Sequence, residues 1–166
     1  MICFKNAQKI DFIPLLDRAF HYGDGCFTTA RFHQNVMELE PLHRARLKLA
    51  AERLYLKFNF DVLEQSLDVL KQQFPSLNGT LKIILSRGEG NRGYAMPEHD
   101  ADLYVLFYPK ATDAFQPEFI HSGVLEQAIG LVMPNLVGLK TLNRLEQVML
   151  KKEAQEKGWL EEIGRA

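Results

Sequence analysis

The side chain most suited to covalent chemistry is that of Lys140, which follows Gly138 and Leu139 and precedes a segment of helical character. The positive end of a helix and partial burial both disfavour an ammonium ion, so we expect them to favour the neutral amine. A neutral amine can form an imine with an aldehyde or abstract a proton. Because most lysines are solvated, an ordinary surface position is the alternative.

Arg46 is a candidate for binding an anion, because a planar guanidinium can donate two parallel hydrogen bonds to a phosphate. It lies on a predicted helix, with His43 three residues earlier on the same side, where the imidazole could fix its orientation. The ordinary alternative for a helical arginine is to lie along the edge of the apolar face or to pair with Glu52 or Asp61.

The stretch GEGNRG at residues 88–93 matches the spacing G-x-G-x-x-G, which is found in dinucleotide-binding proteins. In those proteins the glycines end a strand and begin a helix, whose amides meet the pyrophosphate. Here residues 80–86 and 103–108 are both strand-like, and Pro97 interrupts the segment between them. We therefore expect a strand, loop and strand, with no helix to hold a phosphate.

Composition excludes several classes of protein. The chain has 166 residues, 46% of them hydrophobic, which suits one globular domain or slightly more. A net charge of -1 gives no field that would attract nucleic acid or an anionic membrane. The N-terminus has no long apolar run, so we expect neither signal peptide nor membrane span and place the protein in the cytoplasm. Cys3 and Cys26 are expected to be reduced, and no H-x-x-x-H pair suggests a metal site.

The elements that must position these side chains follow from hydrophobic periodicity. The first forty residues favour short extended segments joined by turns. Apolar residues then recur at helical spacing over 47–54 and 63–74, and strands are predicted at 80–86 and 103–108. This order predicts a two-layer α+β domain of antiparallel sheet and two helices over residues 1–110.

A second region is predicted beyond a linker at residues 111–118, which mix proline, aspartate and small residues. It holds an extended piece and a helix over about 141–157, with Gly158 as its stop. Residues 119–166 are too few to enclose a core alone, so we expect a partner chain to cover them, or an architecture that ends early.

Four ordered stretches resemble the fold-type IV pyridoxal-phosphate enzymes, and most closely the aminodeoxychorismate lyases. DRAFHYGDGCFTTAR is similar to the family pattern D-R-x-x-x-[FY]-G-D-G-x-F-x-T, and HRARL to H-x-x-R-L. GLKTLNRLEQV resembles the lysine motif K-x-L-N-R-L-E-Q, and SRGEGNRGY the lyase stretch S-R-G-x-G-x-R-G-Y. The resemblance spans essentially the whole chain and implies a class IV aminotransferase-like fold whose second α/β domain is incomplete.

The resemblance also assigns roles. Lys140 would be the catalytic residue and would bind pyridoxal 5'-phosphate covalently, and Arg46 would bind the phosphate of that cofactor. Phe27 and Thr29, alternate residues of one strand, would face the substrate. Tyr108 is a weaker candidate of the same kind, with an ordinary strand aromatic as the alternative. The implied reaction releases pyruvate from 4-amino-4-deoxychorismate and forms 4-aminobenzoate for folate biosynthesis. The resemblance also implies that the chain binds this small-molecule substrate as a homodimer.

The chain departs from the family after the lysine helix. The family continues with a strand and a G-x-V-x-E turn whose glutamate pairs with the pyridine nitrogen, and with further groups that bind the phosphate. Glu161 and Glu162 do not stand in that pattern, so neither is assigned as the nitrogen partner. The expectation is a C-terminally truncated member with weaker catalysis.

Two alternatives to a lyase stay open on the sequence alone. One is an inactive remnant or interaction module in which only the N-terminal α+β layer folds well. The other is a class IV aminotransferase that acts on branched-chain or D-amino acids. The stretches SRGEGNRGY and KTLNRLEQ favour the lyase over the aminotransferase.

Overall fold

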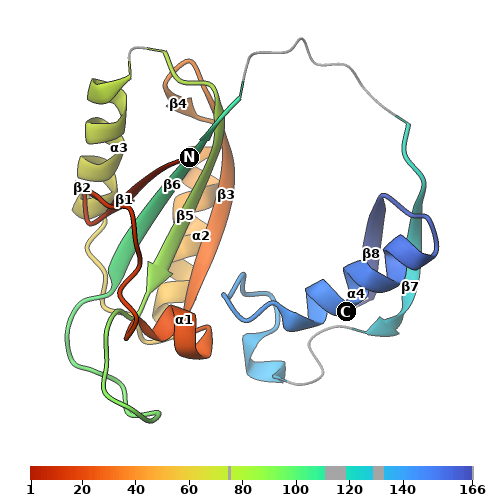
Figure 1. Cartoon of the computed structure of the whole chain (residues 1–166). Helices are drawn as coiled ribbons and strands as arrows, with labels where there is room; N and C mark the ends of the chain where they lie inside the picture. Colours follow the sequence, from red (N-terminus) through yellow and green to blue (C-terminus); the bar gives the residue numbers. More distant parts are fainter. Residues whose placement is uncertain (75, 111–118, 129–132, 166) are drawn as a thin grey trace. The chain divides into compact units, whose positions relative to one another are not determined.

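The computed structural model describes residues 1–74, 76–110, 119–128 and 133–165, with the side chains of 126–128 and 162–165 left out. The chain divides into two compact units, each of which is considered by itself (Figure 1). The first unit holds residues 1–112 together with Leu139–Asn143, and the second holds residues 113–138 and 144–166. The expected linker, residues 111–118, lies outside the described residues.

The first unit is built on a six-stranded sheet in the order β2-β1-β6-β5-β3-β4, and every neighbouring pair is antiparallel. This sheet confirms the predicted α+β class with an antiparallel sheet. Both strands predicted around the glycine loop are present: the first begins one residue earlier than predicted, and the second extends one residue further at each end. The strands are β1 (Ile2–Lys5), β2 (Gln8–Lys9), β3 (Gly25–His33), β4 (Val36–Met37), β5 (Gly79–Ser86) and β6 (Asp102–Pro109).

The side chains of β3 alternate between a buried face and an open face of the sheet, because successive side chains of a strand point in opposite directions. Its even-numbered residues from Cys26 to Phe32 are buried, whereas Thr29 and Arg31 are exposed and Phe27 is partly exposed. The buried face continues across β5 and β6 in a row of aliphatic and aromatic side chains that are fully buried. These are Leu81, Ile83, Leu85, Leu103, Val105 and Phe107.

Two long helices, α2 (Glu40–Arg53) and α3 (Asp61–Gln73), supply the second layer (Figure 1). α2 packs along β3 and α3 along β6, as their contacts show. The apolar stripes of both helices are buried, which the helical spacing predicted, and Pro41 lies in the first turn of α2. Asp61 is the first residue of α3, and its amide donates to Asn59 Oδ1 at 2.9 Å. A short helix, α1 (Arg18–Tyr22), precedes β3.

The second unit holds β7 (Ser122–Ala128), a 3-10 turn η1 (Pro134–Leu136), α4 (Leu145–Glu156) and β8 (Glu161–Arg165). β7 and β8 pair in parallel, with α4 between them in the chain. The sequence pattern predicts neither β8 nor the turn at η1; it favours extended chain over residues 129–138, of which 129–132 lie outside the described residues. The helix predicted over about 141–157 begins four residues too early, since α4 begins at Leu145.

No helix in the described ranges is both long and apolar enough to cross a bilayer.

Candidate functional site

The segment Leu139–Asn143, which contains Lys140, belongs to the first unit and runs beside the start of β3. The Phe27 amide donates to the Lys140 carbonyl at 2.9 Å, and the Leu142 amide donates to the Gly25 carbonyl at 2.9 Å. Cys26 and Thr141 form an antiparallel bridge between these bonds. Because the backbone of this segment is committed to β3, it cannot begin the helix that the sequence predicted there.

Gly25 permits this close approach. A Cβ atom on Gly25 would lie 2.1 Å from the Leu85 carbonyl oxygen and 2.8 Å from Leu142 Cδ1, both far inside van der Waals contact. The absence of a side chain at Gly25 therefore lets β3 pair with β5 on one side and receive the lysine segment on the other.

Lys140 is partly buried, and its Nζ lies 5.0 Å from the centroid of the Phe27 ring. Lys82 Nζ on β5 lies 4.9 Å from the same centroid, so two ammonium groups share one aromatic ring. The helix that follows Lys140 begins five residues later in the chain, at Leu145. The charge at a helix end acts mainly within its first turn, so the expected effect of a helix end on Lys140 does not apply, whereas the expected partial burial is present.

Arg46 extends from α2 toward β3, where its Nη1 donates to Thr28 Oγ1 at 3.1 Å. The same Thr28 hydroxyl lies 2.6 Å from Nδ1 of His43, one helical turn before Arg46. In the described part of the chain neither Glu52 nor Asp61 pairs with Arg46, so the ion pairs considered as alternatives do not form. The guanidinium is exposed and has no carboxylate partner among the described residues.

Positive charge is concentrated around His43. Burial lowers the pKa of His43 from its usual value, and the charges of Arg46 and Lys140 lower it further. Arg46 bonds to Thr28 and Lys140 Nζ lies 5.0 Å from the centroid of the Phe27 ring, so the two side chains singled out in the sequence lie beside adjacent residues of β3. A region of this kind attracts an anion, because Arg46 has no carboxylate to neutralise it.

The predicted substrate residues lie on the open face of the sheet but not all at the same end. Phe27 pairs with Ile84 of β5, and Ile84 pairs in turn with Tyr104 of β6, so the three residues lie in one row across the sheet. Tyr108, which is 40% exposed, lies on the same face four residues further along β6, roughly 13 Å away along the strand. Phe27 lies close to Lys140, and Thr29 is the next residue of β3 on the same open face, whereas Tyr108 is distant from Lys140.

Two residues of this region were missed by sequence reasoning. Thr28 could have been placed on the buried face from the alternation of β3, but its contact with α2 depends on how helix and sheet pack. Lys82 could have been placed on the open face of β5. That it neighbours Phe27 follows only from the register of β3 with β5, in which Thr29 pairs with Lys82.

The glycine loop at residues 88–93 is tied to the segment around α1. The Arg18 amide donates to the Gly88 carbonyl at 2.9 Å, and Arg18 Nη1 donates to the Gly93 carbonyl at 3.0 Å. All of residues 87–101 are described and none is helical, which confirms the predicted strand, loop and strand. The loop therefore lacks the helix that a dinucleotide fingerprint needs.

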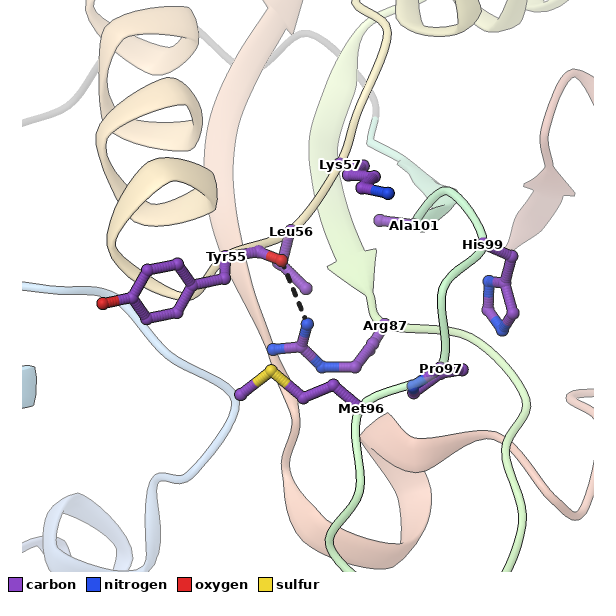
Figure 2. A pocket seen from close by; sticks show the side chains of 8 residues that line it. All are labelled: Tyr55, Leu56, Lys57, Arg87, Met96, Pro97, His99 and Ala101. Atoms are coloured by element: carbon purple, nitrogen blue, oxygen red, sulfur yellow. Dashed lines mark hydrogen bonds between the residues drawn. The ribbon is translucent and has the colours of Figure 1, made fainter.

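A cavity of about 50 Å³ lies beside this loop, and Figure 2 shows the side chains that line it. Its buried guanidinium, that of Arg87, donates to the carbonyls of Leu54 and Tyr55 at 2.6 and 3.1 Å and to Asp24 at 2.8 Å. These bonds occupy all three guanidinium nitrogens and cap the end of α2, so Arg87 has a structural role. It is lined by Tyr55, Leu56, Lys57, Arg87, Met96, Pro97, His99 and Ala101.

No cluster of three or more metal-ligating side chains occurs within the described ranges.

Comparison with known proteins identifies relatives along most of the chain. The sequence profile of the amino-transferase class IV family matches residues 25–163. An aminodeoxychorismate lyase from Vibrio harveyi is 33% identical over 154 residues, which are 89% of this chain and 55% of that protein. The crystal structure of 4-amino-4-deoxychorismate lyase from Pseudomonas aeruginosa has a TM-score of 0.78 at 28% identity, covering 98% of this chain and 60% of that one.

A hypothetical aminotransferase from Mycobacterium tuberculosis, in a PLP-bound form, shares the fold with a TM-score of 0.78 at 20% identity. That match covers 99% of this chain and 61% of the other. The chain thus spans between 55% and 61% of the length of these three relatives.

Proposed function

Because the chain belongs to the amino-transferase class IV family, we propose that it acts as a pyridoxal-phosphate-dependent lyase. The substrate is 4-amino-4-deoxychorismate, and the products are pyruvate and 4-aminobenzoate for folate biosynthesis. The 33% identity to the lyase from Vibrio harveyi supports this reaction over others of the family. The stretches SRGEGNRGY and KTLNRLEQ, which resemble those of the lyases, support it further.

One observation carries the proposal: Arg46 Nη1 bonds to Thr28 at 3.1 Å, and Lys140 Nζ lies 5.0 Å from the ring centroid of Phe27, the preceding residue of β3. Pyridoxal phosphate presents an aldehyde and a phosphate, and the chain offers a primary amine and a guanidinium in one region. Arg46 has no carboxylate partner among the described residues, so its charge is available to a phosphate. The donor set therefore fits the cofactor.

Each residue of the candidate site would have a separate role. Lys140 Nζ would bind the aldehyde covalently and later accept and return protons at the substrate. Arg46 would bind the phosphate through its planar fork. Phe27 and Thr29 would contact the substrate from the open face of the sheet, with Tyr108 as an outer contact. When bound, the cofactor supplies an electron sink for charge that develops on the substrate.

The test is covalent fixation of the cofactor. After addition of pyridoxal 5'-phosphate and borohydride reduction, peptide mass spectrometry should find the added mass on Lys140, and Lys140→Ala should abolish it. Lys82→Ala is the matched control, because Lys82 contacts the same Phe27 ring without belonging to the lysine segment. Label spread over several lysines, or none on Lys140, would contradict the proposal.

Release of pyruvate from aminodeoxychorismate then separates the lyase from an aminotransferase. The second reaction is kept as a candidate because the PLP-bound hypothetical aminotransferase from Mycobacterium tuberculosis shares the fold. Amino transfer to 2-oxo acids without pyruvate release would favour it. A chain that binds no cofactor would instead support the inactive remnant or interaction module.

We also propose a homodimer in the cytoplasm. The segment before β3 exposes large apolar side chains, with Phe12, Leu15 and Phe20 exposed by 77%, 73% and 68%. A second copy of the chain would cover such a surface. The two cysteines are free, as in a reducing compartment. Sedimentation should report a dimer that Leu15→Glu dissociates, whereas Val36→Glu on β4 should leave it intact.

A further inference from the structure

We propose that Thr28 is a positioning residue for the cofactor site. Its hydroxyl donates a hydrogen bond to His43 and at the same time accepts one from Arg46, which holds Arg46 in position to bind a phosphate. The inference rests on the proposed function, because it assigns a role in the same site. It adds two side chains, Thr28 and His43, that would not touch the cofactor themselves.

The direction of the Arg46 bond follows from which groups can donate, and the direction of the His43 bond, which depends on the tautomer, is part of the proposal. Arg46 Nη1 is a donor only, so Thr28 Oγ1 must accept the bond of 3.1 Å between them. The threonine hydroxyl has one proton of its own, and its second close partner is His43 Nδ1 at 2.6 Å. Directing that proton to Nδ1 satisfies all three groups, and it requires His43 to be neutral with its proton on Nε2.

The charges around His43 favour the same state. Burial, the Arg46 charge on the same helix and the Lys140 charge from the segment beside β3 all lower the pKa of His43. A protonated His43 would turn Nδ1 into a donor, and two cations would then compete for one threonine oxygen. The neutral imidazole avoids this repulsion and leaves the oxygen to Arg46.

Thr28 is well suited to act as a fixed point. It is fully buried in β3, where it pairs with Ile83 of β5, and its β-branched side chain has few rotamers. A hydroxyl that donates a hydrogen bond also becomes a better acceptor, so the bond to His43 strengthens the bond from Arg46. The exposed arginine is thereby held at a defined place on the sheet.

The experiment compares two ligands, pyridoxal 5'-phosphate and pyridoxal, which lacks the phosphate. Thr28→Val removes the hydroxyl at nearly constant shape and should weaken binding of pyridoxal 5'-phosphate about tenfold, the loss expected for a hydrogen bond to a charged group. Binding of pyridoxal should change by less than about twofold. Thr28→Ser keeps the hydroxyl and should retain most of the affinity, and Thr80→Val at the far end of β5 is the control.

Variants of His43 test the second link without touching the core of the sheet. His43→Asn keeps an acceptor near the place of Nδ1 and should bind pyridoxal 5'-phosphate nearly as the parent does. His43→Leu lacks the acceptor and should lose affinity as Thr28→Val does. In an Arg46→Ala background neither Thr28→Val nor His43→Leu should weaken binding further, because both act through Arg46.

Each outcome either supports or overturns the role proposed for Thr28. Equal loss for both ligands in Thr28→Val and His43→Leu would show a merely structural role, and unchanged affinity in both would also overturn the inference. If the parent chain binds neither ligand at Lys140, the proposed function fails. The nitrogen NMR spectrum of His43 still tests the inference separately, since a proton on Nδ1 in the ligand-free chain at neutral pH would overturn it.

Discussion

Replacing Tyr104 by phenylalanine should destabilise the first unit by a predictable amount, because it removes one bond from a buried carboxylate. Asp17 is fully buried and accepts hydrogen bonds from the Tyr104 hydroxyl at 2.5 Å, from Ser86 Oγ at 2.5 Å and from the Ala19 amide at 2.8 Å. These bonds join the segment before β3 to the ends of β5 and β6. Tyr104→Phe removes one of the three donors and leaves the ring in place.

The magnitude follows from the environment of the bond. Burial raises the pKa of Tyr104, and its bond to Asp17 raises it further, so the phenol keeps its proton and donates at any physiological pH. A hydrogen bond to a charged group contributes about 1.5–3 kcal/mol, and the carboxylate keeps two donors in the variant. We therefore expect the free energy of unfolding of the first unit to fall by about 2 kcal/mol. Tyr55→Phe is the control, because Tyr55 is 78% exposed and should change stability by less than about 0.5 kcal/mol.

Urea unfolding followed by hydrogen exchange separates the two units. Peptides from β5 and β6 report the first unit, whereas the fluorescence of Trp159, the one tryptophan of the sequence, reports the second. The loss should be confined to the first unit, and exchange should also rise in the loop at 88–93, whose start is bonded to Arg18. A loss no larger than that of Tyr55→Phe would refute the reasoning that Asp17 depends on this donor.

Three further predictions concern packing and pH. Gly25→Ala places a Cβ atom 2.1 Å from the Leu85 carbonyl oxygen, so urea unfolding should show a loss of about 3 kcal/mol or more and Lys140 should be fixed less efficiently by borohydride. The lowered pKa of His43 means that its contribution is complete above about pH 6.5 and is lost as pH falls through the folded-state value; His43→Asn should flatten that decline. Two carbonyl acceptors raise the pKa of His99, so its contribution is complete below about pH 6.5 and is lost as pH rises; melting curves of His99→Gln should lack this loss.

Much of the first unit could be predicted because its elements are bounded by strong local signals. β5 and β6 are rich in branched and aromatic side chains and are followed by Arg87 and Lys110, and the helices repeat apolar residues at helical spacing. Local propensity and tertiary packing agree in these segments. The sequence could not give the strand order, because several orders bury the same side chains.

The lysine segment shows where local pattern fails. The sequence LKTLNRLEQV has helical spacing from Thr141 onward, yet residues 140–142 bond to β3 and α4 begins at Leu145. The competing contact is more than a hundred residues away in the chain, at Gly25 and Phe27, so no local window contains it. Tertiary pairing therefore overrides helical propensity here.

The candidate site was predictable in its chemistry and not in its geometry. A lysine and an arginine in polar stretches indicate an amine and an anion-binding group, and the two side chains contact adjacent residues of β3, Phe27 and Thr28, while their roles stay a prediction. Of the two causes expected to favour a neutral Lys140, the helix end is absent because the segment pairs with β3, and the partial burial is present. The contacts of Thr28 with His43 and Arg46 become visible only when β3 and α2 are placed together.

Lys140 owes its position to the main chain. The Phe27 amide bonds to the Lys140 carbonyl, and the Leu142 amide bonds to Gly25, so the segment is held by groups that do not depend on the lysine side chain. Arg46 is held differently, by a side-chain bond to Thr28 that its neighbour His43 supports. A substitution at residue 140 should therefore remove the amine and leave the segment in place, whereas one at residue 28 leaves the guanidinium and removes what fixes it. The site thus separates into a part set by backbone pairing and a part set by one hydroxyl.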